Sequence, residues 1–381
     1  MKITDVKLRF AKHYLFVQVY TDAGIVGLGE AGNWGYLQAT AAAIEKFADY
    51  LIGKDPFRIE DFNQNFLRSV YFRGSVIMSA ISAIDIALWD IKGKALGVPC
   101  YQLLGGKCRD ELRTYASQLQ FGWGNAEKKD ILVTPAQYAA AAEKALEQGY
   151  DCIKVDVNEI DLEGYAKRRN LYGCFAGRDL RVGYDRLKAI REAVGDQIDI
   201  IVEAHALTDT TSAIEFGRMI EEFRISAYEE PVMSLNPMQL KEVHDNVNIP
   251  IAAGERVFTR WGFRPFFENH IIDLIQPDLG TCGGFTEGKK ICDMGHIYDT
   301  TAQIHVCGGP IMTAASLQLE AAIPNFAIHE LHRYALLEGN RRTCKYDYMP
   351  VNGKYQIPDL PGIGQELTDE CIAESPKVTV K

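Results

Sequence analysis

The strongest constraint on this chain is a series of ionisable residues that recur about every 25 residues in its C-terminal half, the length of one βα unit of a parallel barrel. Each of them ends a short apolar stretch that is typical of a buried strand. In chain order they are Glu203, Glu229, Glu255, Asp278, His305 and Glu330. Because the strands of a (β/α) barrel all end at one mouth, this register predicts a single shared site. Surface charges that fall in phase by chance would explain one such position much more easily than six.

Strand-like and helix-like stretches alternate through residues 112–345, as they do in a parallel barrel. The predicted strands are 113–117, 152–157, 198–203, 226–229, 251–253, 274–276, 301–305 and 326–330. The predicted helices are 135–148, 182–194, 210–223, 237–243, 285–298 and 311–323. Residues 112–345 are therefore expected to form one barrel.

A different order of elements is predicted for residues 1–111. Their strand-like stretches are 2–10, 14–21 and 25–29, and their helical stretches are 37–51, 59–70 and 75–96. Strands that are followed by helices indicate a separate α+β domain. Residues 346–381, which are rich in proline, are expected to be loop-like and to run back across the surface.

Composition excludes several classes of protein. With 381 residues, 47% of them hydrophobic and 24% charged, the chain matches an ordinary globular protein that builds a large core without disulfides. Its net charge of -10 disfavours nucleic acid or an anionic membrane as the main partner, so we expect neither. The nine cysteines contain no Cys-x-x-Cys pair, which suits a reducing compartment. Because no stretch resembles a membrane span or a signal peptide, we expect a cytoplasmic protein.

Three of the strand-end residues are glutamates on consecutive predicted strands. Glu203, Glu229 and Glu255 bring three carboxylates together, and without a cation these groups would raise one another's pKa. Three hard oxygen ligands that leave room for water and substrate oxygens suit Mg²⁺ better than zinc. We therefore predict one Mg²⁺ site per chain at these glutamates.

The next two strand ends carry a carboxylate and an imidazole. Asp278 and His305 are on neighbouring predicted strands, and a carboxylate bonded to one ring nitrogen fixes the tautomer of a histidine and raises its basicity. His305 is thus predicted to be a general base. A cation that binds a substrate carboxylate would stabilise the enolate formed when the adjacent carbon loses its proton.

His205 follows Glu203 by two positions in the segment Ile-Ile-Val-Glu-Ala-His. Because side chains on a strand alternate between two faces, both residues are expected to point the same way at the end of the strand. From the residues alone, a polar strand end in contact with solvent explains this pair about as well as a chemical role.

Together these residues and their motifs resemble the enolase superfamily, mandelate racemase subgroup. The motifs are Tyr-Glu-Glu-Pro at Glu229, Ala-Gly-Glu at Glu255, Gln-Pro-Asp at Asp278 with Gly283 and Gly284 after it, and His305 before Gly308, Gly309 and Pro310. The resemblance covers nearly the whole chain. It implies a modified (β/α)7β TIM barrel, an N-terminal α+β capping domain and a C-terminal segment that returns to the cap. It also implies Mg²⁺-assisted removal of the proton next to a carboxylate by a Lys or His base.

Two residues on the predicted strand 152–157 separate the reactions of this subgroup. Racemases and epimerases that resemble the chain carry a second base in a Lys-x-Lys sequence, whereas this chain has Lys154 and Asp156 at those positions. Two-base racemisation is therefore disfavoured. We interpret Lys154 as neutralising the substrate carboxylate. Lys154 and Asp156 are both candidates for substrate binding.

His205 favours dehydration. A carboxylate-x-His segment resembles the acid-sugar dehydratases of the galactonate type, in which that histidine protonates the departing C3 hydroxyl. The resemblance implies that His305 takes the C2 proton, that His205 expels water, and that the enol tautomerises to a 2-keto-3-deoxy acid. Glu203 is a departure, since many relatives have the shorter Asp at the first metal position.

Other residues are assigned by resemblance alone. Glu330 resembles the group that hydrogen-bonds the enolate oxygen, and its neighbour His329 is expected to face away. Trp34 and Arg256 are candidates for substrate contact, Trp34 because similar loops close over the barrel mouth in relatives. Further candidates are Tyr36, Arg73, Arg260 and Trp261, together with Arg168 and Tyr172.

The predicted function is Mg²⁺-dependent dehydration of an acid sugar, an aldonate or aldarate similar to galactonate, gluconate or arabinonate. One alternative is a one-base epimerase or cycloisomerase that acts on another carboxylic acid. A second alternative is a mannonate-type dehydratase. It is less favoured, because the resemblance implies an arginine at the position where this chain has Asp278. A non-catalytic relative is disfavoured, because the glutamates and the His–Asp dyad are all present. By resemblance, the chain is expected to form a homo-oligomer.

Overall fold

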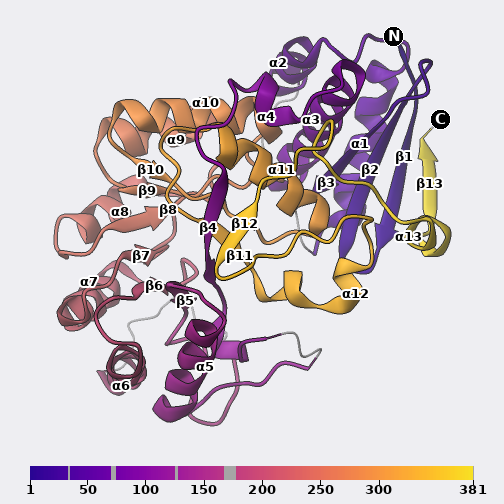
Figure 1. Ribbon diagram of the computed structural model, residues 1–381. Coiled ribbons are helices and arrows are strands. Elements are labelled where there is room, and N and C mark those ends of the chain that lie inside the picture. Colours follow the sequence, from indigo (N-terminus) through magenta and orange to yellow (C-terminus); the bar gives the residue numbers. More distant parts are fainter. Residues whose placement is uncertain (33–34, 70–73, 125–127, 167–176, 381) are drawn as a thin grey trace.

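The computed structural model describes residues 1–32, 35–69, 74–124, 128–166 and 177–380, which form a capping domain and a barrel (Figure 1). The capping domain begins with the antiparallel strands β1 (Ile3–Ala11), β2 (Tyr14–Thr21) and β3 (Val26–Ala31). Helices α1 (Leu37–Leu51), α2 (Ile59–Ser69) and α3 (Ser75–Leu96) follow. Apolar side chains from the sheet and the three helices form a core of their own.

Eight parallel strands form the wall of the barrel in the described part of the chain. They are β4 (Glu111–Ala116), β5 (Cys152–Val155), β6 (Asp199–Glu203), β7 (Ala227–Glu229), β8 (Ile251–Ala253), β9 (Leu274–Ile275), β10 (Thr301–Ala302) and β11 (His329–Leu331). Each strand from β4 to β9 pairs with the next, and β11 pairs with β4. A bridge between Ala302 and Phe326 closes the ring beside β10.

Within the described residues, seven helices alternate with these strands and cover the outside of the barrel (Figure 1). They are α5 (Pro135–Glu147), α6 (Gly177–Val194), α7 (Thr210–Ile220), α8 (Pro237–His244), α9 (Thr259–Glu268), α10 (Gly284–Ile297) and α11 (Pro310–Ala322). This order confirms the predicted (β/α)7β barrel with an N-terminal capping domain. No helix in the described residues is long and apolar enough to cross a bilayer.

Local sequence explains where several barrel helices begin. Thr134 forms a capping box with the third residue of α5, and Pro135 occupies the first helical position. The side chains of Asp209 and Asn236 accept backbone N–H groups at the starts of α7 and α8. Each cap ends the loop that leaves the carboxyl end of a strand, and these loops surround the mouth of the barrel.

The structure differs from the sequence-based prediction at α9. The segment Thr-Arg-Trp-Gly-Phe-Arg-Pro-Phe-Phe-Glu contains Gly262 and Pro265, which both weaken a helix, and the sequence pattern therefore predicts none there. Phe263, Phe266 and Phe267 are nevertheless buried against the barrel. Tertiary packing thus stabilises this helix against its own low propensity.

The C-terminal tail also differs from the prediction, which was of a loop-like segment. It contains β12 (Lys354–Gln356), α13 (Asp369–Glu374) and β13 (Lys377–Val380). Strand β12 pairs antiparallel with β4 of the barrel, and β13 pairs antiparallel with β1 at the edge of the capping sheet (Figure 1). The expectation of a loop is wrong: a turn at Gly353, whose φ is 69°, leads into β12, and α13 precedes β13.

Candidate active site

The carboxyl ends of β6, β7 and β8 bring three glutamates together. Glu203 and Glu229 are the last residues of β6 and β7 and are direct partners across the two strands. Glu255 follows β8 after Gly254, whose φ of 148° is readily adopted by glycine alone. Ligand oxygens of the three carboxylates all lie within 4.8 Å of one another. The spacing that suggested a shared site therefore corresponds to real proximity.

This cluster has the features of a site for a hard cation. Burial raises the pKa of Glu229 to about 8, and the carboxylates of Glu203 and Glu330 add to the shift, while Lys154 opposes it. The Oε2 atom of Glu229 is buried, and no hydrogen-bond donor among the described residues reaches it. Such an oxygen is well satisfied by a cation, so the residues present fit Mg²⁺.

Lys154 of β5 lies among the same carboxylates. Its Nζ atom is 2.6 Å from Glu229, 2.7 Å from Glu330 and 3.5 Å from Glu203. Burial alone would lower the pKa of this ammonium group, but the three carboxylates outweigh burial and hold the pKa well above its usual range. Lys154 thus balances charge inside the site, and its contact with a substrate carboxylate stays a prediction.

His305 and Asp278 follow β10 and β9, and a parallel bridge joins their backbones. The Nδ1 atom of His305 is 2.7 Å from Oδ2 of Asp278, and its Nε2 atom is 3.2 Å from Glu255. Burial alone would lower the pKa of His305, but the surrounding carboxylates, Glu255 first, raise it well above its usual range. A cation bound at the glutamates would offset that negative charge and bring the imidazole closer to the range of a base.

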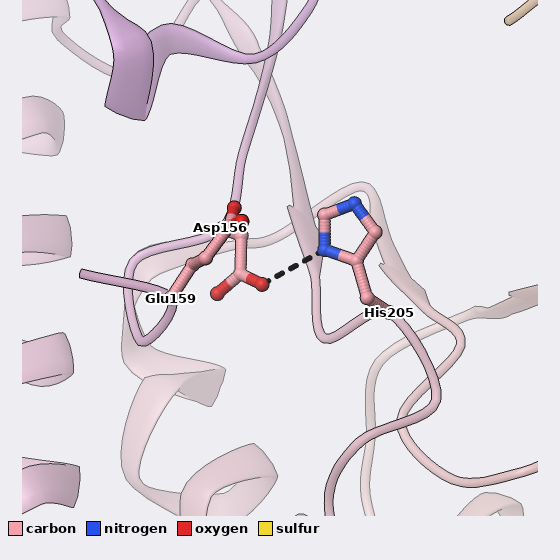
Figure 2. A group of neighbouring side chains, drawn as sticks. All are labelled: Asp156, Glu159 and His205. Atoms are coloured by element: carbon pink, nitrogen blue, oxygen red, sulfur yellow. Dashed lines mark hydrogen bonds and ion pairs between the residues drawn. The ribbon is translucent and has the colours of Figure 1, made fainter. Parts of the chain in front are cut away.

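His205 is held by another carboxylate (Figure 2). Strand β6 ends at Glu203, and His205 lies beyond it with a φ of 50°, followed by Ala206 with a φ of 55°. From this left-handed turn, its Nδ1 atom is 2.9 Å from Oδ2 of Asp156 and its Nε2 atom is 3.2 Å from Glu203. The proximity of His205 and Glu203 agrees with the prediction, but a turn produces it rather than strand alternation.

Asp156 and Glu159 come from the segment that follows β5 (Figure 2). Asp156 is fully buried, and its Oδ1 atom accepts the N–H of Asn158 at 2.9 Å. Glu159, which sequence reasoning missed, accepts a hydrogen bond from Gln120 at 2.8 Å. Burial opposes protonation of the neighbouring His205, but Glu203 and then Asp156 raise its pKa to about 10. The predicted substrate-binding residue Asp156 is thus the hydrogen-bond partner of a histidine.

Glu330 in β11 connects the lysine and the base. Its Oε2 atom accepts the N–H of Val306 at 2.9 Å and lies 3.8 Å from Nε2 of His305. Burial would raise the pKa of Glu330, but Lys154 and His305 outweigh burial and hold the pKa well below its usual range. His329 points the other way, as expected, and its Nδ1 atom lies 2.6 Å from a buried carboxylate of α11.

Arg256 follows the third glutamate and is paired with two carboxylates. Its guanidinium lies 2.9 Å from Glu230 and 2.9 Å from Glu255. Glu230 was missed by sequence reasoning, although it stands next to Glu229 in the Glu-Glu-Pro motif, where a positive φ of 42° turns it away from the strand. The pairing places Arg256 at the edge of the cluster, where its contact with substrate stays a prediction.

Other predicted residues lie farther from the cluster or outside the described chain. Arg260 is paired with Glu287 at 2.6 Å and stacks on the half-exposed ring of Trp261. Trp34, Arg73, Arg168 and Tyr172 lie outside the residues that the structure describes. For Arg260, the ion pair already explains the position of the side chain.

Known proteins with the same architecture are similar to this chain over its whole length. The mandelate racemase / muconate lactonizing enzyme N-terminal domain family matches residues 4–105, and the enolase C-terminal domain-like family matches residues 137–371. D-galactonate dehydratase of Pectobacterium atrosepticum is 33% identical over 99% of this chain and 95% of its own length. D-xylonate dehydratase of Haloferax volcanii is 35% identical over 97% of this chain and 88% of its own length.

Solved structures give the same result. An enolase-superfamily member from Salmonella Typhimurium is 55% identical and superposes with a TM-score of 0.98 over the full length of both chains. An enolase of the mandelate racemase subgroup from Agrobacterium tumefaciens is 28% identical, with a TM-score of 0.87 over 100% of this chain and 98% of its own. The chain therefore belongs to the enolase superfamily, in the mandelate racemase subgroup.

Proposed function

We propose that this protein dehydrates an acid sugar, an aldonate or aldarate, to a 2-keto-3-deoxy acid, with one Mg²⁺ per chain as cofactor. The observation that carries the proposal is the pair of aspartate-bound histidines, His205 and His305, that approach the glutamate cluster from β6 and β10. These strands are four apart in the ring of eight, so they lie on opposite sides of the barrel. Two proton-transfer groups on opposite sides of one site suit the removal of a proton and a hydroxyl from adjacent carbons.

His305 is the base in this proposal. Asp278 holds Nδ1, which fixes the ring and leaves Nε2 as the atom directed at the glutamate cluster. Nε2 takes the proton from C2 of the substrate, and the electron pair of the C–H bond passes into the enolate of the substrate carboxylate. Glu330 lies 3.8 Å from the same nitrogen, next to the expected position of that enolate. Its predicted hydrogen bond to the enolate oxygen remains part of this proposal.

His205 is the acid. Asp156 holds its ring through Nδ1, and the negative charge of that carboxylate favours the protonated form of the imidazole. Nε2 gives its proton to the C3 hydroxyl, the C3–O bond breaks with its electron pair, and water leaves. The electron pair of the enolate becomes the C2–C3 double bond, and the resulting enol tautomerises to the keto acid.

Mg²⁺ held by Glu203, Glu229 and Glu255 would supply the positive charge that stabilises the substrate carboxylate and its enolate. We keep Lys154, Asp156, Arg256 and Trp34 as candidates for contact with the sugar. Lys154 and Arg256 each neutralise a metal-binding glutamate at 2.6 Å and 2.9 Å, so both influence the charge that a substrate meets. A homo-oligomer in the cytoplasm stays our expectation.

The relatives support the substrate class. Two proteins that are about one third identical over almost the whole chain are named for D-galactonate and D-xylonate, which are both aldonates. Epimerisation by two bases receives no support from the residues on β5, because Asp156 stands where a second lysine would be needed and is bonded to His205. Dehydration therefore accounts for more of the observed contacts than the alternatives do.

The test is a library of aldonic and aldaric acids incubated with the purified protein and Mg²⁺ in deuterated water. We expect at least one acid to yield a 2-keto-3-deoxy product, and we expect chelation of Mg²⁺ to abolish the reaction. Deuterium at C2 of recovered substrate, without keto acid from any member of the library, would instead establish one-base exchange and overturn the proposal.

A further inference from the structure

The end of β3 in the capping domain contacts both loops that carry the base dyad. Glu30, on β3, contacts the loop that leads from His305 into α11. Gly32, two residues further on, contacts the loop that leads from Asp278 into α10. One short segment of the capping domain therefore contacts the loop after His305 and the loop after Asp278. Neither Glu30 nor Gly32 touches the imidazole itself.

Glu30 binds the start of a barrel helix. Its carboxylate is fully buried, and Oε1 accepts the N–H of Gly309 at 2.5 Å while Oε2 accepts the N–H of Met312 at 2.9 Å. These N–H groups belong to the N-cap residue and to the first turn of α11, where intrahelical acceptors are missing. A Cβ atom at Gly309 would lie 3.1 Å from Oε1 of Glu30, so the loop after His305 is packed directly on this carboxylate.

Gly32 and Gly280 bring two backbones into contact. The N–H of Gly32 donates to the carbonyl oxygen of Gly280 at 3.3 Å. A Cβ atom at Gly32 would lie 3.0 Å from the Cα and carbonyl carbon of Gly280, and one at Gly280 would lie 2.8 Å from the Cα of Gly32. Because these contacts involve backbone on both sides, a side chain at either position displaces one of the loops.

Gly280 in turn holds the carboxylate of the dyad. Its N–H donates to Oδ1 of Asp278 at 2.6 Å, while Oδ2 of the same carboxylate is 2.7 Å from Nδ1 of His305. The contacts thus run without a break from Gly32 through Gly280 and Asp278 to the imidazole. A displacement of Gly280 changes the orientation of the carboxylate and, with it, the direction of Nε2.

We propose that Glu30 and Gly32 are positioning residues for the His305–Asp278 dyad, so that the capping domain sets the orientation of the general base. For the chemical role of His305, this inference rests on the proposed function. Displacements of about 1 Å in a catalytic group lower rates by as much as about 100-fold. Changes at these two residues should therefore act on the proton-transfer step more than on substrate binding.

The first test compares Glu30→Gln with Asp90→Asn. Asp90 is a matched control, because it is another fully buried capping-domain carboxylate that accepts two backbone N–H groups, those of Leu28 and Ile363, each at 2.9 Å. Neither of these groups belongs to a loop that carries the dyad. We expect Glu30→Gln to lower kcat for C2 deuterium exchange by about 10- to 100-fold, with KM within about twofold of wild type. Asp90→Asn should keep kcat within about twofold.

The second test compares Gly32→Ala with Gly177→Ala. Gly177 begins α6, and a Cβ atom there lies within 4 Å of no other described residue, so the control introduces the same methyl group without a contact in the described structure. We expect a fall in kcat for Gly32→Ala alone. If Gly32→Ala does not fold, the kcat of Glu30→Gln alone tests the proposal. Unchanged kcat in Glu30→Gln, or a KM that rises as much as kcat falls, overturns the proposal.

A spectroscopic readout separates this inference from the proposed function. The hydrogen-bonded Nδ1 proton of His305 gives a downfield NMR signal, which His305→Asn identifies by its loss. If the wild type turns over no acid sugar, the proposed function fails, but the signal still reports the dyad. A changed signal in Glu30→Gln and an unchanged one in Asp90→Asn support the positioning role, and an identical signal in wild type and Glu30→Gln overturns it.

Discussion

His205 and His305 present the same ring nitrogen to the glutamate cluster. The Nε2 atom of His205 is 3.2 Å from Glu203, and the Nε2 atom of His305 is 3.2 Å from Glu255. Each Nδ1 atom is bonded to an aspartate, at 2.9 Å and 2.7 Å respectively. The two rings thus share this pattern of contacts, although only His305 also lies near Glu330, at 3.8 Å. The proposed division into acid and base therefore depends on where the substrate places its C2 and C3.

Replacing His305 by asparagine should abolish proton abstraction. We expect C2 deuterium exchange and dehydration both to fall by about 10²- to 10⁴-fold, because a general base contributes roughly that factor. Isotope incorporation followed by mass spectrometry measures the first rate and keto-acid formation the second. Mg²⁺ binding should be kept. Full turnover by His305→Asn would remove this residue from its role.

Replacing His205 by asparagine should separate the two half-reactions. Without the acid, the C3 hydroxyl leaves slowly, so dehydration should fall by about 10²- to 10⁴-fold while C2 deuterium exchange continues near the wild-type rate. The ratio of deuterated substrate to keto acid is the measurement. Equal losses of both rates, or unimpaired dehydration, would show that His205 is not the proton donor.

Removing one carboxylate from the cluster should weaken Mg²⁺ binding. For Glu229→Gln we expect the Kd for Mg²⁺ to rise by at least about tenfold, which is about 1.4 kcal/mol, since a charged ligand is lost. Calorimetric titration with Mg²⁺ measures it. Glu268→Gln, at an exposed residue paired with Arg264 on α9, is the control. An unchanged Kd in Glu229→Gln would contradict the assignment of the metal site.

Asp85 should make the stability of the protein depend on pH. Burial raises its pKa from 3.8 to about 7 in the folded state. Between these values the unfolded chain has lost the proton that the folded chain keeps, so folding stability falls as pH rises, by up to about 1.4 kcal/mol per pH unit. Above about pH 7 the loss of folding stability is complete and no longer changes with pH.

Asparagine at this position never ionises. The melting temperature of Asp85→Asn, measured relative to wild type from about pH 4 to about pH 8, should therefore rise up to about pH 7 and then level off. Asp293→Asn, at a half-exposed carboxylate paired with Lys289 on α10, serves as the control. Parallel profiles for wild type and Asp85→Asn would show that Asp85 does not titrate as proposed.

Much of the fold follows from sequence periodicity. The helices predicted at 37–51 and 75–96 have the same bounds as α1 and α3, because their apolar residues recur with a helical period. The recurrence of acidic strand ends likewise gives the order of the barrel strands. Helix α9 was missed because aromatic packing overrides Gly262 and Pro265, and no local signal reports such packing.

The site was predictable at residues that end strands and not at those that depend on turns. Glu203 and Glu229 lie where the spacing puts them, as strand partners. His205 comes close to Glu203 because His205 and Ala206 both adopt the left-handed conformation, which the local sequence does not predict. Glu30 reaches Gly309 across 279 positions of the chain, and such contacts follow only from the assembled fold.

The pairing of β13 with β1 has a consequence for synthesis on the ribosome. Strands β1, β2 and β3 of the capping sheet leave the exit tunnel before the barrel, yet the outer strand of that sheet, Lys377–Val380, is translated after the entire barrel. Until then β1 is an open sheet edge, the kind of surface on which nascent chains associate. The capping domain therefore begins to form before the barrel and is completed after it, and a ribosome stalled within the barrel would leave β1 open to pairing with a neighbouring chain.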